Sequence, residues 1–220
     1  MRAGIRYIAA LVAIAAPLAA VEAVSFPNGK IVLHGVLYKP TEPGPFRAVL
    51  YNHGSAPDNS AASEALGPIF ARHGWLFFMP HRRGQGLSSS AGPYIRNEIA
   101  AAAQTGGIPA AAASMIRLLE TDHLSDQLAA LDWLRKRDYV RPNQIAVAGN
   151  SFGGIETLLG AERGSYCAAV DFSGGAESWA QAPELQTVMS RAARNSRAPI
   201  FLSSHKTISI FPQPGPSLPS

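Results

Sequence analysis

The segment GNSFGG at residues 149–154 has the residue types and spacing that point most directly to chemistry. The apolar run IAVA (145–148) precedes it and a helical pattern over 153–162 follows. A G-x-S-x-G segment between a strand and a helix forms a sharp turn that exposes the serine hydroxyl. Glycine is needed on both sides, because a Cβ there would collide across the bend. The pattern predicts Ser151 as a nucleophile for acyl carbon, with the backbone N–H of Phe152, at the start of a helix, as one oxyanion donor.

A second oxyanion donor is expected in the loop that follows the apolar run 48–51 (AVLY). The candidate is the backbone N–H of Ser55, with that of Ala56 as the alternative. His53, in the same loop, is interpreted as a structural hydrogen-bonding residue rather than a base. The segment HRRGQG (81–86) is interpreted as a loop that shapes the rim of the pocket, since two arginines and a lone G-x-G are weak evidence for a phosphate loop.

The elements that must position these residues alternate along the chain. Apolar runs predict strands, and helical spacing predicts helices between them; Leu124, Leu128, Leu131 and Leu134 share one helical face, with Asp126 expected to face water. Such alternation predicts a mainly parallel sheet with helices on both faces, in one α/β domain over 24–203. The predicted strands are 30–38, 48–51, 75–79, 145–148, 168–172 and 199–202, and the predicted helices include 61–73, 153–162 and 183–195.

The composition limits the classes of protein that fit. Of 220 residues, 47% are hydrophobic and 15% charged, so the chain has ample apolar surface to bury and is not a disordered polar chain. The net charge of +4 is spread along the sequence, which gives little support for a nucleic-acid partner. Cys167 is the only cysteine and is expected to be a small buried residue, and the six histidines show no metal-ligand spacing. No cofactor is expected.

Several segments together resemble the α/β-hydrolases of the dienelactone hydrolase-like group and the related prolyl-oligopeptidase-like esterases and peptidases. The matching segments are YNHGS (51–55), HRRGQG (81–86), DQLAALDWL (126–134), IAVAGNSFGG (145–154) and AAVDFSGG (168–175). The resemblance implies the α/β-hydrolase fold and cleavage of a small acyl substrate, an ester, lactone or amide, through an acyl-enzyme on Ser151. Dienelactone hydrolases proper carry cysteine at this position, so their substrate is not transferred to this chain.

A serine nucleophile needs a histidine base and an acid that orients the base, in the chain order Ser, Asp or Glu, His for this fold. Two interpretations remain open. In the first, Asp171 is the acid and His205 the base. In the second, the Pro/Ser-rich tail 204–220 is not the native ending, and the chain is a catalytically incomplete homologue without its last strand and helix.

The second interpretation has a specific form. Codons for His205 onward, read two bases later, can spell Gln-Asn-Asp-Phe-Asp-Leu-Ser-Pro, which resembles the acid-bearing turn of this group. The hypothesis is a frameshift near codon 203.

Two further segments carry expectations about location and substrate access. Residues 1–23 combine Arg2 and Arg6 with an apolar run and small residues before the expected cleavage site, which predicts a signal peptide and a periplasmic or secreted protein without a membrane anchor after cleavage. The Gly/Ala/Pro-rich segment 88–119 is expected either to form a small cap over the pocket, through Tyr94, Ile95 and Met115, or to be a surface insertion.

Overall fold

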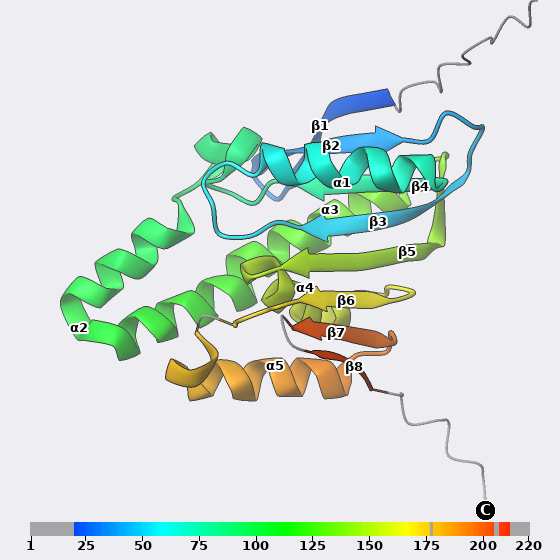
Figure 1. Ribbon diagram of the computed structural model, residues 1–220. Coiled ribbons are helices and arrows are strands. Elements are labelled where there is room, and N and C mark those ends of the chain that lie inside the picture. The colour runs from blue at the N-terminus through cyan, green and yellow to red at the C-terminus, as the bar shows by residue number, and fades with distance from the viewer. Residues whose placement is uncertain (1–19, 177, 205–206, 212–220) are drawn as a thin grey trace, which may run out of the picture.

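A computed structural model of the protein describes residues 20–176, 178–204 and 207–211. These residues build one eight-stranded mixed sheet in the order β1-β2-β4-β3-β5-β6-β7-β8 (Figure 1). β3, β4, β5, β6 and β7 run parallel, whereas β1, β2 and β8 add antiparallel pairs at the two sides. The strands are β1 Ala20–Asn28, β2 Ile31–Lys39, β3 Phe46–Asn52, β4 Trp75–Pro80, β5 Val140–Asn150, β6 Ala169–Phe172, β7 Ile200–Ser204 and β8 Thr207–Phe211.

Helices cover both faces of the sheet, as the alternation of elements predicted. In β3 and β4, neighbouring residues point to opposite faces, so Leu50 and Phe78 belong to one apolar cluster and Val49 and Phe77 to the other. The first cluster packs against α3, α4 and α5, and the second against α1. The helices are α1 Ser60–Arg72, α2 Ile95–Leu118, α3 Leu124–Arg135, α4 Phe152–Arg163 and α5 Pro183–Asn195, with short helical turns at Gly86–Ala91, Leu119–His123 and Trp179–Gln181.

The first described strand overlaps the predicted signal peptide. Cleavage after Ala23 would remove the first four residues of β1 and leave the pairs from Val24–Gly35 to Asn28–Ile31. The buried anchor of this strand, Phe26, lies in the part that cleavage would keep. Export stays a prediction.

The far side of the sheet differs from the sequence expectation. Little strand pattern was expected after Leu202, but Thr207–Phe211 forms β8, which pairs antiparallel with β7. Hydrogen bonding to an open sheet edge requires only a free backbone, so even a tail without clear alternation can add a strand. The further parallel strand and helix that the resemblance implies are not among the described residues.

The segment expected to be a cap forms α2, a long helix that kinks at Gly106 and Gly107 and projects from the body of the molecule (Figure 1). Its base is anchored in the core by Ile95 and Met115, which are buried rather than available to a substrate. Among the described residues, the stretch Ile95–Arg135 is long and apolar enough to cross a membrane, by length and composition only.

Two single-residue expectations were wrong. Asp126 does not face water: its side chain is 2% exposed and accepts hydrogen bonds from Arg83 and from Asn28 Nδ2. Cys167 is exposed: it lies just before β6, its backbone N–H already donates to Ile145 O of β5, and its side chain stays open to solvent. Helical spacing and residue type predict only how buried such a residue usually is. Contacts with residues from distant segments decide its burial in this fold.

Candidate active site

Ser151 occupies a strained turn between β5 and α4. Its φ of 58° and ψ of −120° lie where residues other than glycine are rare, and such a conformation persists only when the surroundings impose it. The surroundings are the two flanking glycines: a Cβ on Gly149 would lie 2.3 Å from the carbonyl oxygen of Gly153, and one on Gly153 would lie 2.0 Å from that of Asn52. The glycine spacing read from the sequence thus has the predicted steric reason, and Ser151 is half-buried at the carboxyl end of β5.

The loop of residues 53–57, here called the oxyanion loop, passes beside Ser151. A Cβ on Gly54 would lie 3.8 Å from the Cβ of Ser151. Because a trans peptide is planar, with its C=O and N–H pointing in opposite directions, whatever holds the carbonyl of one residue also orients the N–H of the next. Gly54 O accepts hydrogen bonds from Arg82 Nη2 at 2.6 Å and from Gln85 Nε2 at 3.3 Å, which directs the N–H of Ser55 to the opposite side of the loop.

The other carbonyls of the oxyanion loop also accept hydrogen bonds. Tyr94 Oη donates to Ser55 O at 2.6 Å, which orients the N–H of Ala56. The remaining contacts are Arg82 Nη2 to His53 O at 2.7 Å, Gln85 Nε2 to Ala56 O at 2.6 Å, Asn59 Nδ2 to Ala56 O at 2.8 Å, and the N–H of Gly86 to Pro57 O at 2.8 Å. Among the described residues, no hydrogen bond uses the N–H of Ser55 or Ala56. Both remain available to a developing oxyanion.

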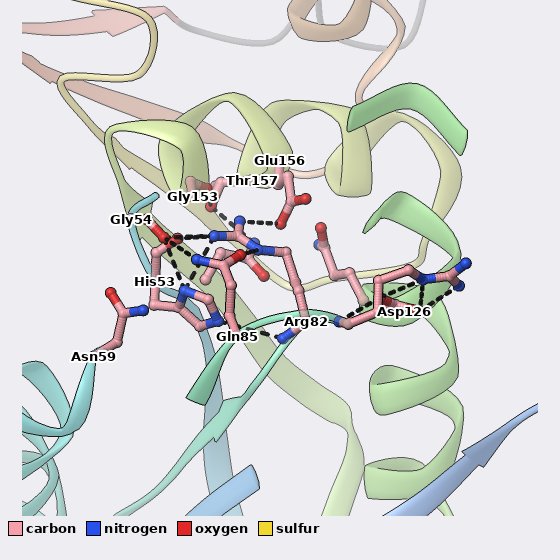
Figure 2. Close-up of polar contacts among 12 residues, drawn as sticks. His53, Gly54, Asn59, Arg82, Gln85, Asp126, Gly153, Glu156 and Thr157 are labelled. Atoms are coloured by element: carbon pink, nitrogen blue, oxygen red, sulfur yellow. Dashed lines mark hydrogen bonds and ion pairs between the residues drawn. The ribbon is translucent and has the colours of Figure 1, made fainter. Parts of the chain in front are cut away.

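Arg82 contacts both the oxyanion loop and α4 (Figure 2). Its Nη1 pairs with Glu156 Oε2 at 2.7 Å, and the two side chains are 4% and 0% exposed. Burial raises the pKa of Glu156 to about 7, because the loss of solvation outweighs the attraction of Arg82. Since Glu156 lies on α4, five positions after Ser151, Arg82 connects the oxyanion loop directly to the helix that follows Ser151.

His53 is buried and hydrogen-bonded, as expected from its interpretation as a structural residue. It is 1% exposed, its Nε2 accepts from the N–H of Arg82 at 3.3 Å, and its Nδ1 lies 2.9 Å from Gly54 O. Burial, reinforced by Arg82, holds the pKa of His53 well below its usual value. His81 and His123 are likewise buried, and burial lowers their pKa values to about 4 and about 3. These three histidines are therefore neutral at physiological pH.

Of the candidate acid and base, the structure describes only the acid, Asp171. Asp171, on β6, lies behind the turn: its Oδ1 accepts from the N–H of Gly174 at 2.7 Å, and a Cβ on Gly154 would lie 2.2 Å from the same oxygen. Burial raises the pKa of Asp171 to about 6. His205 lies outside the described residues. Within the described part of the chain, no hydrogen bond joins the Ser151 hydroxyl to a histidine, and no cluster of His, Cys, Asp or Glu could hold a metal ion.

Sequence reasoning predicted the turn at Ser151 and the loop that follows β3 but missed the roles of four residues that support them. Gln85 and Arg82 stand in HRRGQG, which was interpreted only as a rim loop, and Glu156 was read only as part of a helix. Tyr94 was considered as a cap residue, not as a donor to Ser55 O. A sequence signal could have identified Arg82 and Glu156. Arg82 closely follows an apolar strand and Glu156 lies inside an apolar helix pattern, and two opposite charges in such positions are expected to pair because an unpaired buried charge is costly.

Comparisons with known proteins agree with the fold described above. Residues 112–171 match the prolyl oligopeptidase family, and no curated protein sequence matches. A Pyrococcus horikoshii acylaminoacyl peptidase has a TM-score of 0.59 at 14% identity, covering 86% of this chain and 32% of its own, so this chain spans about a third of that protein.

Two smaller proteins are similar over more of their length. A protein assigned as a dienelactone hydrolase from Klebsiella pneumoniae has a TM-score of 0.58 at 16% identity, with 84% of each chain covered. The 2,6-dihydroxy-pseudo-oxynicotine hydrolase has a TM-score of 0.54 at 18% identity, covering 83% of this chain and 52% of its own. The chain therefore has the α/β-hydrolase fold and is similar to the dienelactone hydrolase and prolyl oligopeptidase groups.

Proposed function

We propose that the protein is a serine hydrolase that cleaves a carboxylic ester, a lactone or a related acyl bond through an acyl-enzyme on Ser151. The strained turn at Ser151 carries this proposal, because its conformation has a steric cost and serves to present the hydroxyl. The Ser55 and Phe152 N–H groups would receive the negative charge of the tetrahedral intermediate. Asp171 and His205 complete the proposal as acid and base, in the chain order typical of the fold.

In the proposed reaction, the base takes the proton of the Ser151 hydroxyl while its oxygen attacks the acyl carbon. The carbonyl oxygen becomes the oxyanion, and its collapse expels the alcohol or amine, which receives the proton from the base. Water then attacks the acyl-enzyme in the same way and releases the acid. The oxyanion loop is preorganised for this sequence, because its carbonyls are already bonded and cannot turn toward the oxyanion.

Phosphonylation by a fluorophosphonate probe tests the nucleophile. We expect the folded protein to be labelled on Ser151 and the Ser151→Ala variant to show only background labelling, measured by intact mass and peptide mapping. Ser173→Ala is the matched control, since Ser173 is, within the described part of the chain, the other non-glycine residue with positive φ, at 56°. Labelling that disappears in Ser173→Ala, or a folded protein that is never labelled, would contradict the proposal, and the second result would favour the catalytically incomplete homologue.

Tyr94→Phe is expected to slow labelling of Ser151 by about fivefold to tenfold. The loss of one hydrogen bond of about 1 kcal/mol frees Ser55 O, so the peptide unit between Ser55 and Ala56 can rotate. This rotation loosens the oxyanion loop that presents the N–H of Ser55. The Tyr166→Phe variant is the control, because Tyr166 Oη accepts a buried hydrogen bond from Gln127, which packs against Gly160 toward the C-terminal end of α4. Equal labelling rates in both variants, measured at equal folded fraction by circular dichroism, would rule out this role of Tyr94.

A further inference from the structure

A second site lies at the opposite edge of the sheet from Ser151. A cleft of about 390 Å³ opens where β3, β4 and β5 begin, whereas Ser151 follows the end of β5. Along β3, the cleft residue Arg47 is separated by five residues, roughly 17 Å of strand, from Asn52 beside the nucleophile turn. The cleft is lined by Pro40, Glu42, Pro43, Pro45, Phe46, Arg47, Arg72, His73, Gly74, Trp75 and Arg141.

Three arginines from three different elements line this cleft. Arg47 is the second residue of β3, Arg72 ends α1 and Arg141 lies near the start of β5. In the described part of the chain none of the three forms an ion pair, whereas Arg82, Arg83 and Arg191 all pair with carboxylates. Glu42 is the only acidic residue in the lining, so the cleft carries more positive than negative charge.

Two of these guanidinium groups are already oriented by neighbours. Arg47 lies over the ring of Trp75, 5.9 Å from its centroid. Arg141 Nε donates to Pro45 O at 2.8 Å and its Nη1 to Gln144 Oε1 at 3.3 Å. Contacts of this kind restrict the arginine side chains before a ligand binds, so less side-chain entropy is lost on binding. The proline-rich turn that receives the Arg141 bond also forms one wall of the cleft.

We propose that this cleft binds a phosphate group, either inorganic phosphate or the phosphate of a monoester or lipid headgroup. Guanidinium groups match phosphate oxygens with paired N–H donors, and a phosphate monoester carries a charge of about −1.5 to −2 near pH 7, which offsets the excess of arginine in the lining. Like-charged arginines gathered in one cleft repel each other, so a bound anion relieves that repulsion. The site is independent of Ser151.

Isothermal titration of the full chain with inorganic phosphate and with glycerol 3-phosphate, at constant ionic strength in chloride, tests the proposal. We expect binding at about 1 mM or tighter and a loss of roughly tenfold or more in the Arg47→Gln/Arg141→Gln double variant. Arg96→Gln/Arg117→Gln is the matched control, since it removes the same charge from exposed positions on α2 and should bind phosphate like the parent. All four substituted residues are exposed, so each variant should fold.

The outcomes separate the possible sources of the phosphate. Binding of inorganic phosphate or glycerol 3-phosphate indicates a soluble ligand. A lipid headgroup is indicated if the protein cosediments with phosphatidylglycerol vesicles but not with phosphatidylcholine vesicles, and if the Arg47→Gln/Arg141→Gln variant no longer does so. Absence of all these interactions at 10 mM phosphate, on the order of ten times the expected constant, or an equal loss in the control variant, would overturn the proposal. Fluorophosphonate labelling of Ser151 should be the same in the parent and in both double variants. This keeps the test of the cleft separate from the test of the proposed function.

Discussion

Alanine in place of Gly153 is expected to abolish fluorophosphonate labelling and to lower the free energy of unfolding by about 3 kcal/mol. The added Cβ would lie 2.0 Å from the carbonyl oxygen of Asn52 and 2.7 Å from that of His53, and both contacts are with backbone atoms. Relief requires α4 to move away from β3, which separates Ser151 from the oxyanion loop. Urea denaturation and the labelling rate measure the two effects.

Gly74→Ala provides the control for this prediction. Gly74 has a φ of 75°, so alanine is strained there, but no atom lies within 4 Å of the added Cβ. The variant is expected to lose about 1 kcal/mol of stability and to keep its labelling rate. If Gly153→Ala behaved in the same way, the steric account of the turn would be wrong.

Replacement of Arg82 by methionine is expected to have the second large effect. The variant leaves Glu156 buried without its partner and releases the carbonyls of His53 and Gly54. Removal of one member of a buried pair costs about 3–5 kcal/mol. We therefore expect a matching loss of stability in urea and a labelling rate reduced by on the order of 100-fold, the effect typical of losing an oxyanion donor.

A double variant separates stability from function. In Arg82→Met/Glu156→Leu both buried charges are gone, and replacement of a buried pair by apolar residues is often neutral for stability. We expect the double variant to regain most of the stability but not the labelling rate, because the carbonyls of His53 and Gly54 still lack the hydrogen bonds from Arg82. Recovery of both would show that Arg82 acts only through folding.

Arg83→Met is the neighbouring comparison. Arg83 pairs with Asp126 and Asp122 rather than with the oxyanion loop. This variant should lose stability while the folded fraction is labelled at the parental rate. Slow labelling in Arg83→Met would mean that the whole HRRGQG segment, and not the Arg82 contact, supports the site.

The sequence predicted the strands and helices of the sheet well where apolar periodicity was strong. The predicted helix 183–195 coincides with α5, and the predicted strand 75–79 lies within β4. β1 was missed because it overlaps a segment with the pattern of a signal peptide, and β8 because edge pairing needs little side-chain pattern. α2 was left undecided between cap and insertion, since alanine and glycine carry no amphipathic signal.

The carbonyl that excludes a Cβ on Gly153 belongs to Asn52 on β3, a constraint that only the fold supplies. The turn at Ser151 was nevertheless readable from the sequence, because a Cβ on Gly149 would meet the carbonyl oxygen of Gly153 only four positions later. The partners of the buried charges were not. Arg82 and Glu156 are separated by 74 positions, and Arg83 and Asp126 by 43, so no local period could pair them. Only the tertiary structure brought them together, because the high cost of an unpaired buried charge is met wherever the fold supplies an opposite charge, at whatever distance along the chain.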